Sequence, residues 1–454
     1  MNDTIAAIAT AYGEGGIGII RISGEKARDV MQAVFKPASK GEIVSRRMTY
    51  GRIIDEDHII DEAMAVYMKG PKTYTAEDTV EIYCHGSIVS LRKTLAAVLR
   101  NGCRTAEQGE FTKRAFLNGR LDLSQAEAVI DIIKAKTDRS FDVAVSQLEG
   151  LFSGRVREIR NKLLDLLVDI TVNIDYPDED IEEITYDKLA GDISLISDSI
   201  DKLLSTAASG RMIREGIRIA IVGKPNVGKS SLMNGLLREA RAIVTEIPGT
   251  TRDTIEETLS IRGIPIYLID TAGIRETDDR VEKIGIEKTK EAFNNADFII
   301  FVVDGSEALT VEDEEIISYL EGRKALVLIN KQDIGNVVNS TIIKDRLPNC
   351  DVIESVLIRG EGLTEVEDKI EALVYGGKLT QQDSIVVNNV RHTDLLIRAK
   401  EALDDAGDMT ERQEALDFIE IDVRNAFDYL GEIIGETVSD EILDEVFARF
   451  CLGK

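Results

Sequence analysis

The sequence Gly223-Lys-Pro-Asn-Val-Gly-Lys-Ser230 matches the phosphate-binding loop pattern G-x-x-x-x-G-K-[ST] in full. It follows an apolar run at 217–222 that predicts a buried strand, and it precedes residues 231–239, which predict a helix. Glycines let the backbone N–H groups of such a loop surround a phosphate, and the positive end of the helix points at it. The lysine, Lys229, then reaches the β- and γ-phosphates, and the serine hydroxyl binds Mg²⁺. The stretch predicts an α/β nucleotide-binding domain.

A second apolar run, residues 266–270, predicts another buried strand, which ends in Asp270-Thr-Ala-Gly273. At this place in a nucleotide hydrolase a carboxylate faces Mg²⁺ and a glycine senses the γ-phosphate. Between the two strands, residues 249–253 (Gly-Thr-Thr-Arg-Asp) predict a switch-like loop, in which Thr251 is available to Mg²⁺.

A third apolar run, residues 325–329, continues into Asn330-Lys-Gln-Asp333. The carboxylate of Asp333 can accept hydrogen bonds from N1 and N2 of guanine, and adenine lacks this pair of donors. Four motifs in this order and spacing predict a guanine-nucleotide hydrolase. The last guanine-contact loop departs from the usual Ser-Ala-x-x-Gly pattern, because Ser355 is displaced by one position.

One residue of this module bears on its mechanism. Ile274 stands directly after Asp-Thr-Ala-Gly, where Ras-like hydrolases carry the glutamine that orients the attacking water. Isoleucine has no polar atom for this task. Other groups must therefore position the water and offset the charge of the transition state.

The composition is that of a globular chain with several cores. Its 454 residues predict two to four domains, and 43% of them are hydrophobic. The sequence has no run of 18 apolar residues and no basic, signal-type start, so we expect neither a membrane span nor a leader. Four scattered cysteines and three histidines show no metal-ligand spacing, which predicts a reduced, cytoplasmic protein. Cys451 lies four residues from the end, but Leu-Gly-Lys after it does not fit a prenylation signal, so an incidental thiol is the plain interpretation.

The net charge of −27 argues against a general nucleic-acid-binding protein, because phosphates would be repelled over most of the surface. The charge is uneven, however. Residues 1–120 hold 17 Lys and Arg against 15 Asp and Glu, which leaves 38 against 67 for the rest of the chain. Any direct RNA contact is therefore expected in the N-terminal part, unless a partner supplies the basic surface.

The first 118 residues alternate predicted strands and helices, which indicates an α+β domain. Three charged residues, Arg21, Glu81 and Arg120, lie in or beside apolar segments of this part. Their spacing alone is at least as compatible with edge-strand positions or with ion-paired positions on the surface. The turn at 13–16 is rich in glycine and, by itself, indicates only a turn.

From residue 121 onward the pattern becomes helical. Ser124-Gln-Ala-Glu127 predicts a capping box that opens a helix, and helical periodicity resumes after the nucleotide segment. Each helical block alone would expose an apolar stripe, so we expect the two blocks to pack together. This predicts an N-terminal domain (1–118), a discontinuous helical domain (119–213 and 377–454) and an inserted GTPase domain (214–376).

Together these elements resemble the tRNA-modification GTPase family known as MnmE or TrmE. The resemblance covers essentially the whole chain and rests on the nucleotide motifs and on residues 3–10, 15–24, 115–127 and 451–454. It implies an α+β, folate-binding N-terminal domain, an α-helical central domain and an inserted α/β P-loop GTPase domain of Ras-like fold.

The resemblance also implies partners and cofactors. The family forms a homodimer through its N-terminal domains, which bind a tetrahydrofolate derivative (5,10-methylene- or 5-formyl-tetrahydrofolate). With the flavoprotein MnmG (GidA), it installs a carboxymethylaminomethyl or aminomethyl group on C5 of the wobble uridine of certain tRNAs. The positions that match its folate site are Arg21, Glu81, Arg120 and Lys454, and Cys451 matches a cysteine important for the modification.

The family is activated by potassium, which bears on the missing glutamine. A cation between the phosphates can offset developing charge as an arginine finger does. The resemblance assigns K⁺ ligands to Asn226, Thr245, Ile247 and Thr250, at a site that forms when two nucleotide domains meet. It assigns Glu282 the task of orienting the attacking water through a second water. From spacing alone, Glu282 would be a solvated helix residue.

The predicted nucleotide site combines the four motifs with the loop that carries the K⁺ ligands. Ser230 and Thr251 are its predicted Mg²⁺ ligands. Its members are Asn226, Val227, Gly228, Lys229, Ser230, Ser231, Thr245, Glu246, Ile247, Pro248, Gly249, Thr250, Thr251, Asp270, Thr271, Ala272, Gly273, Asn330, Lys331 and Asp333. Catalytic roles are expected for Lys229, Glu282 and Cys451.

Two other functions fit parts of the sequence. One is a ribosome-assembly or other translation-associated GTPase, whose N-terminal domain binds RNA without folate. The other is a switch or scaffold, in which hydrolysis only resets binding. Retention of folate by the protein separates the first of these from the tRNA-modification interpretation.

Overall fold

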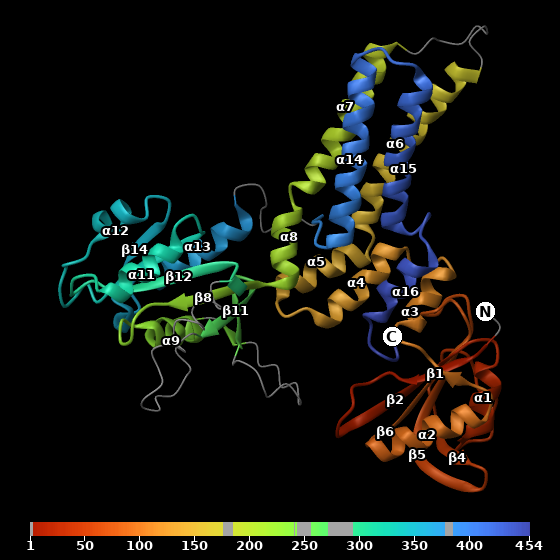
Figure 1. Ribbon diagram of the computed structural model, residues 1–454. Helices are drawn as coiled ribbons and strands as arrows, with labels where there is room; N and C mark the ends of the chain where they lie inside the picture. The colour runs from red at the N-terminus through yellow and green to blue at the C-terminus, as the bar shows by residue number, and fades with distance from the viewer. Residues whose placement is uncertain (1–2, 176–184, 240, 243–255, 271–293, 377–384) are drawn as a thin grey trace. The chain divides into compact units, whose positions relative to one another are not determined.

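The computed structural model describes residues 3–175, 185–239, 241–242, 256–270, 294–376 and 385–454 (Figure 1). The chain divides into two compact units. The N-terminal unit comprises Met1–Ile130, Gln147–Ile181 and Leu416–Lys454, and the nucleotide unit comprises Asp131–Ser146 and Glu182–Ala415.

A seven-stranded sheet forms the core of the N-terminal unit. Neighbouring strands of this sheet are antiparallel, except that β1 and β7 are parallel. In spatial order the strands are β3 (Phe35–Pro37), β4 (Thr49–Asp55), β5 (His58–Met68), β6 (Thr79–Gly86), β2 (Gly15–Ser23), β1 (Ile5–Ile8) and β7 (Arg104–Thr105).

Helices α1 (Ala27–Val34) and α2 (Ile88–Arg100) cover one face of this sheet (Figure 1). Ile20 and Ile22 of β2 are fully buried in the core that these helices share. Successive side chains of a strand point to opposite faces. Arg21 therefore points to the face away from α1 and α2.

The other helices of this unit bring together segments that lie far apart in the sequence. Helix α6 (Leu151–Asp175) packs along α15 (Leu416–Ile434), although the two are far apart in the chain (Figure 1). Helix α16 (Asp440–Ala448) buries Leu443, Val446 and Phe447 together with residues of α4 (Leu123–Lys134) and lies against α3 (Glu110–Leu117). The last helix is thereby fixed close to the N-terminal sheet.

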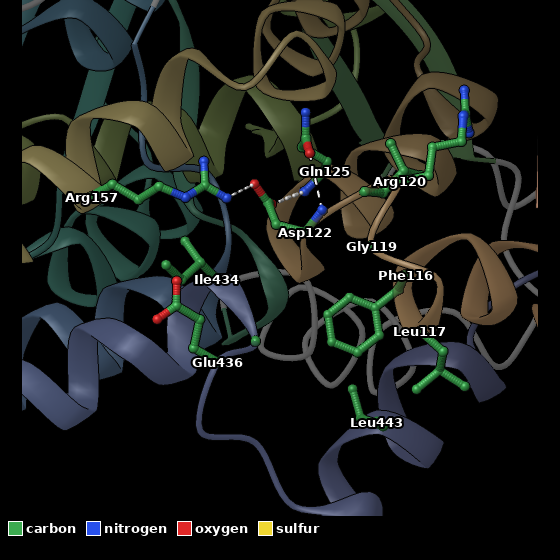
Figure 2. A pocket seen from close by; sticks show the side chains of 12 residues that line it. Phe116, Leu117, Gly119, Arg120, Asp122, Gln125, Arg157, Ile434, Glu436 and Leu443 are labelled. Atoms are coloured by element: carbon green, nitrogen blue, oxygen red, sulfur yellow. Dashed lines mark hydrogen bonds and ion pairs between the residues drawn. The ribbon is translucent and has the colours of Figure 1, made fainter. Parts of the chain in front are cut away.

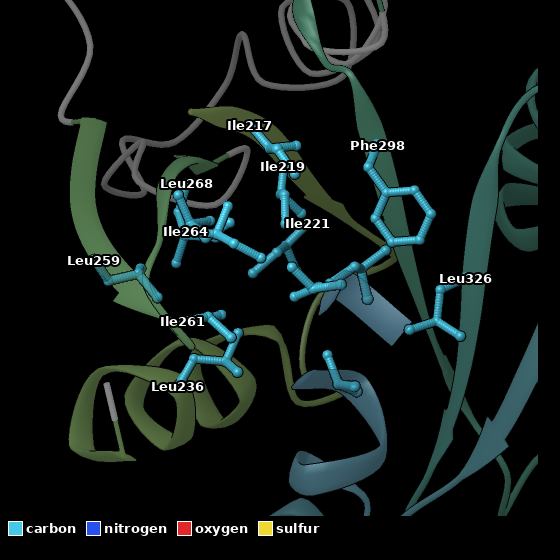
Figure 3. Packing of buried hydrophobic residues seen from close by; sticks show 14 of the residues in the cluster. Ile217, Ile219, Ile221, Leu236, Leu259, Ile261, Ile264, Leu268, Phe298 and Leu326 are labelled. Carbon is cyan, nitrogen blue, oxygen red and sulfur yellow. The ribbon is translucent and has the colours of Figure 1, made fainter. Parts of the chain in front are cut away.

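The nucleotide unit has its own seven-stranded sheet, in which the strands from β14 to β11 are parallel. Apolar residues of β8 and its neighbours form a continuous core, as Figure 3 shows for Ile219, Ile221 and Leu326. In spatial order the strands are β14 (Asp351–Glu354), β13 (Ala325–Asn330), β12 (Phe298–Asp304), β8 (Ile217–Val222), β11 (Ile264–Asp270), β10 (Glu256–Ile261) and β9 (Arg241–Ala242).

Helices cover both faces of this sheet. The helices α9 (Lys229–Glu239) and α13 (Leu363–Tyr375) share one core with it, and α11 (Val311–Leu320) and α12 (Ser340–Arg346) share the other. A mostly parallel sheet with helices on both faces is the doubly wound α/β architecture. The remaining helices of the unit are α5 (Asp138–Leu148), α7 (Tyr186–Leu204), α8 (Ala207–Glu215) and α14 (Val390–Glu411).

The predicted capping box at Ser124 is wrong by two residues. Asp122 Oδ1 accepts hydrogen bonds from the backbone N–H of Gln125 (2.9 Å) and from the Ser124 hydroxyl (2.7 Å), and Gln125 Oε1 accepts from Asp122 N–H (3.0 Å). The acidic side chain just before the helix thus caps it, and Ser124 lies inside the first turn. Among the described helices, none combines the length and apolar character that crossing a membrane requires.

Candidate functional site

The predicted phosphate-binding loop connects β8 to α9 at the carboxyl edge of the parallel strands. β8 lies between β11 and β12; after β8 the chain forms β9 to β11 on one side of it and then β12 to β14 on the other. Such a switch point is where doubly wound proteins bind nucleotides. The structure therefore places the loop where its chemistry requires it.

Close packing fixes the shape of the loop. Gly223 has φ +147°, and a Cβ there would lie 2.4 Å from the carbonyl oxygen of Val302. Gly228 has φ +116°, and its Cβ would lie 2.2 Å from Nδ2 of Asn330. Asn226 is exposed and has φ +62°. Both glycines are thus required by conformation and by space.

Asn330 joins two loops of the site. Its side chain is buried, donates a hydrogen bond from Nδ2 to the Val227 carbonyl (2.7 Å) and accepts one at Oδ1 from Leu357 N–H (3.0 Å). It therefore ties the phosphate loop to the loop that begins η1 (Leu357–Arg359). Removal of this side chain would leave a buried donor and a buried acceptor unpaired.

Two ion pairs hold the rest of the Asn-Lys-Gln-Asp motif. Lys331 Nζ lies 2.6 Å from Asp304 Oδ2 at the end of β12, and Asp333 Oδ2 lies 3.6 Å from the Arg359 guanidinium. Burial raises the pKa of Asp304, but hydrogen bonds from Lys331 and Ser306 outweigh it and lower the pKa overall. The Asp304 carboxylate thus stays charged and anchors Lys331.

Lys229 and Ser230 begin α9. The Lys229 ammonium donates to the carbonyl groups of Gly223 (2.6 Å) and Lys224 (2.7 Å), across the mouth of the loop. Ser230 is exposed at the helix N-terminus. The structure therefore brings together the lysine, the hydroxyl and the positive end of a helix.

Sequence reasoning missed Lys224, Asp304 and Arg359. Lys224 pairs with Glu307 (2.9 Å) and Asp313 (3.4 Å); burial lowers its pKa, but these carboxylates outweigh burial and raise it. Asp304 could have been found from its place at the end of the apolar run 298–303, since ligand-site residues gather at the carboxyl ends of parallel strands.

Several predicted residues lie outside the described part of the chain. Asp270 is still within the described part: it is the last residue of β11 and is paired with Ile221 in the register of β8. The predicted residues outside the described part are Thr245, Glu246, Ile247, Pro248, Gly249, Thr250, Thr251, Thr271, Ala272, Gly273 and Glu282, together with Ile274.

A second candidate site lies on the exposed face of the N-terminal sheet. Arg21 and Glu81 face each other across β2 and β6, and Nε and Nη2 of the arginine both lie 2.9 Å from Glu81 Oε1. Glu81 Oε2 accepts a hydrogen bond from the Tyr83 hydroxyl (2.6 Å). Burial and this carboxylate raise the pKa of Tyr83 to about 12, so the phenol remains a donor. Both strands lie inside the sheet, so the pair is not at an edge.

Tyr74 lies between two cations of this site. The guanidinium carbons of Arg21 and Arg120 lie 5.6 Å and 4.9 Å from the centroid of its ring, and Arg120 also donates to the Tyr74 carbonyl (3.0 Å). Both distances are within the range of cation–π attraction. The structure therefore brings together the three charged residues that the sequence singled out.

The end of the chain lies at the same place. Leu452 forms a β-bridge with Gln108, and the Gly453 carbonyl accepts a hydrogen bond from Arg21 Nη1 (3.3 Å). Lys454 is half-buried, and burial and the neighbouring Arg21 lower its pKa. Cys451 is exposed. The terminal residues are thus part of the site and not a free tail.

A groove of about 520 Å³ adjoins these residues within the N-terminal unit. Figure 2 shows Asp122 at its centre, held by Arg157 (2.7 Å) and by the helix cap at Gln125. Arg120 lines the groove and also lies over the Tyr74 ring, so this residue belongs both to the groove and to the site around Arg21, Glu81 and Tyr74 (the Arg21 site). Its other lining residues are Phe116, Leu117, Gly119, Leu121, Ile434, Gly435, Glu436 and Leu443.

Comparisons with known proteins show which family the chain resembles. Residues 4–120 match the family model described as the GTP-binding protein TrmE N-terminus, and residues 123–451 match the MnmE helical domain. Two curated relatives, each called tRNA modification GTPase MnmE, are similar over the full length of both chains. They come from Alkaliphilus metalliredigens (53% identical) and Clostridioides difficile (52%).

A solved structure, the G domain of the FeoB iron transporter of T. maritima, is 25% identical. The match covers 34% of this chain and 96% of that one, at a TM-score of 0.26, which is too low to support a structural inference. The two family models and the full-length relatives are sufficient by themselves. This chain belongs to the MnmE family of tRNA modification GTPases, which makes it a GTP hydrolase with a part in tRNA modification.

Proposed function

We propose that this chain is a potassium-dependent GTPase that modifies C5 of the wobble uridine in certain tRNAs. It would act with a flavoprotein of the MnmG (GidA) kind and with a tetrahydrofolate one-carbon donor. The observation that carries the proposal is the contact between the two ends of the chain, in which Gly453 and Lys454 lie against Arg21 and Glu81.

The residues at this contact fit a folate derivative. The Glu81 carboxylate can accept hydrogen bonds from the N–H groups of a pterin ring, and the Tyr74 ring offers an aromatic face. Arg120 has no carboxylate partner within ion-pair distance in the described part of the chain, so its charge is available to the carboxylates of a folate glutamate. Lys454 would add a second positive charge nearby.

When bound, the tetrahydrofolate derivative would supply the one-carbon unit. Arg21 and Glu81 would orient it, and the exposed thiol of Cys451 would lie three residues from Lys454 as a nucleophile or a proton donor. Burial and the positive charge of Arg21 lower the pKa of Lys454. Its Nζ would donate hydrogen bonds to the bound folate derivative.

Equilibrium binding of 5-formyl-tetrahydrofolate to the full chain tests this half of the proposal. Glu81→Ala should abolish measurable binding, because it removes the acceptor and leaves Arg21 without its partner. Glu62→Ala is a matched control, because Glu62 also forms a cross-strand ion pair, with Arg52 (3.4 Å), elsewhere on the same sheet. Equal loss in both variants, or none in Glu81→Ala, would contradict the folate assignment.

The nucleotide half of the proposal assigns roles to the loop residues. Lys229 would leave its two carbonyl partners to contact the β- and γ-phosphates, and Ser230 would bind Mg²⁺ with Thr251 and Asp270 nearby. Asn226 would be a K⁺ ligand, because its exposed side chain carries an amide oxygen. Bound K⁺ would supply positive charge that offsets the charge of the transition state.

GTP turnover in KCl and in NaCl of equal ionic strength tests the potassium role. The rate should be much higher in KCl, and Asn226→Ala should remove the difference. Glu282→Ala should slow hydrolysis and leave GTP affinity nearly unchanged, since a water-orienting group acts mainly in the transition state. Equal rates of the unaltered chain in both salts would exclude the potassium mechanism.

Assembly and location belong to the same proposal. We expect a homodimer formed through the N-terminal units, a larger complex with the flavoprotein, and a cytoplasmic site of action. Size-exclusion chromatography with light scattering, with and without the flavoprotein, measures both assemblies.

A further inference from the structure

Four exposed cations gather on two adjoining segments of the N-terminal unit. Arg46 and Arg47 lie in the loop before β4, and Lys69 and Lys72 lie directly after β5. Within the described residues, none of the four has a carboxylate at ion-pair distance. We call these four residues the basic patch.

Hydrogen bonds hold the two segments together. Arg46 N–H donates to the Tyr67 carbonyl (2.7 Å), Lys69 N–H donates to the Ser45 hydroxyl (3.0 Å), and the Arg46 guanidinium donates to the Lys72 carbonyl. The four charges are therefore presented by a joined surface and not by two independent loops. Like charges held this close repel one another, which costs free energy unless an anion binds.

Asp78, an acid close to the patch in sequence, is engaged elsewhere. Asp78 accepts hydrogen bonds from the Tyr67 hydroxyl (2.7 Å) and from Gly70 N–H (2.9 Å), so its oxygens are directed into the loop. Burial and this carboxylate raise the pKa of Tyr67 to about 12, which keeps the phenol a donor. Asp78 thus shapes the loop that carries Lys69 and Lys72.

Two other arginines of this unit are paired with carboxylates. Arg28 of α1 lies 3.3 Å from Glu42, and Arg52 of β4 lies 3.4 Å from Glu62. In a chain of net charge −27, a group of four cations without ion pairs among the described residues is a place where a polyanion can approach. Each cation that neutralises an RNA phosphate also releases a condensed counterion, which favours binding at low salt.

The basic patch is close in sequence to the candidate modification site. Lys72 is two residues before Tyr74, whose ring lies between Arg21 and Arg120. We propose that the phosphate backbone of the tRNA substrate crosses Arg46, Arg47, Lys69 and Lys72, and that this contact brings the target base to the Arg21 site. The placement rests on the proposed function, because it takes the Arg21 site as the place of modification. Exposed Tyr50, on the strand after the loop, adds a ring on which an unpaired base can stack.

Binding of labelled tRNA to the full-length protein, measured at several salt concentrations, tests this proposal. Two double variants, Arg46→Gln/Arg47→Gln and Lys69→Gln/Lys72→Gln, each remove two charges. Each should weaken binding and reduce the slope of log K against log salt by about 1 to 2. The second variant leaves the Arg46 side chain in place, so loss of loop structure cannot explain both results.

Arg92→Gln/Lys93→Gln is the matched control. It removes the same charge from exposed positions of α2 that carry no ion pair in the described residues. The control should keep the slope of the unaltered chain, and all three variants should keep its GTP turnover. A control that weakens binding as much as the patch variants, or patch variants with an unchanged slope, would overturn the proposal.

Two further outcomes also overturn it. One is the absence of tRNA binding by the unaltered chain at low salt. The other is a pair of results for the patch variants: they bind tRNA normally, but they bind polyglutamylated folate more weakly than monoglutamylated folate. That result would assign the patch to the carboxylates of folate. Glu81→Ala reports separately on the proposed function, since folate binding can fail there while the salt slope for tRNA stays normal.

Discussion

Gly453 shows how a single residue can fix the end of the chain. Its φ is +88°, and a Cβ would lie 2.3 Å from the Ile8 carbonyl oxygen and 3.0 Å from the Ala9 Cα. No side chain fits there without moving the backbone of the strand end. The contact with Arg21 therefore depends on the absence of a side chain at this position.

Gly453→Ala should displace the terminal residues from the Arg21 site. We expect loss of 5-formyl-tetrahydrofolate binding and of tRNA modification, with GTP turnover unchanged. Gly102→Ala is the control, because Gly102 also has positive φ (+107°) but no atom within 4 Å of an added Cβ. Normal folate binding by Gly453→Ala would show that the site does not need the tail in this position.

Asp333 is expected to make the nucleotide site prefer guanine to other bases. Asp333→Asn should weaken GTP binding by about tenfold to a hundredfold, since hydrogen bonds to charged groups contribute about 1.5–3 kcal/mol each. Binding of xanthosine triphosphate should improve, because an amide matches the oxygen that replaces the N2 amine. Competition binding measures both, and an unchanged preference for GTP would remove Asp333 from this role.

Sequence reasoning reached residues within motifs and missed residues that hold motifs in place. Asn330 was predicted from its motif, but its bonds to Val227 and Leu357 join segments far apart in sequence. Arg21, Glu81 and Arg120 could be singled out only as charges in apolar surroundings, or by resemblance. Their meeting at Tyr74 depends on sheet register and on the turn before α4, neither of which spacing reveals.

At the scale of elements, a buried ion-pair network ties α3 to the start of the chain. Arg114 is 2% exposed and lies 2.8 Å from Asp3, 2.9 Å from Glu110 and 3.1 Å from Glu77. Arg104 adds further hydrogen bonds to Glu110. The Arg114–Glu77 contact also holds the loop that carries Tyr74, so the network supports the Arg21 site from behind.

Glu110→Gln should destabilise the N-terminal unit by about 1.5 to 3 kcal/mol near neutral pH, because it weakens the charge-assisted hydrogen bonds that Arg104 and Arg114 donate to this buried carboxylate, although both arginines keep Asp3 as a partner. Burial raises the pKa of Glu110, but hydrogen bonds from Arg104, Glu107 N–H and Arg114 outweigh it and lower the pKa overall. A lowered carboxyl pKa contributes stability that is present above its ordinary value of 4.5 and is lost as pH falls through the folded value.

The stability difference between Glu110→Gln and the unaltered chain should therefore be full near pH 7 and shrink below pH 4.5. Denaturant unfolding at a series of pH values measures it. Glu107→Gln, at an exposed position three residues earlier, is the control and should show little change. A difference that grows as pH falls would contradict the charge assignment.

Strong local patterns predicted the long elements well. The strand at 217–222 is confirmed without change, and the helix after the phosphate loop begins two residues earlier than predicted. The helical periodicity predicted after the nucleotide segment ends in α16 (Asp440–Ala448), and Ser439 is its N-cap by backbone geometry without a side-chain hydrogen bond. Short elements such as β3 and β7 were not predicted, because two or three residues carry no periodicity.

At the scale of the whole molecule, helices from before and after the nucleotide sheet pair with each other. Helix α6 packs on α15 in the N-terminal unit, and α7 packs on α14 in the nucleotide unit. Helical periodicity indicated these helices, but which helix meets which depends on long-range packing. The predicted boundaries of an inserted domain at 214 and 376 remain predictions.

The central claim is that the end of the chain completes a modification site on the N-terminal sheet, apart from the GTPase loops. A chain that ends at Phe450 tests it most directly, because it lacks only Cys451 to Lys454. With this chain as the sole copy in cells, mass spectrometry of tRNA nucleosides should show no modified wobble uridine, while the purified protein hydrolyses GTP at the normal rate. Modified uridine at the normal level would contradict the claim.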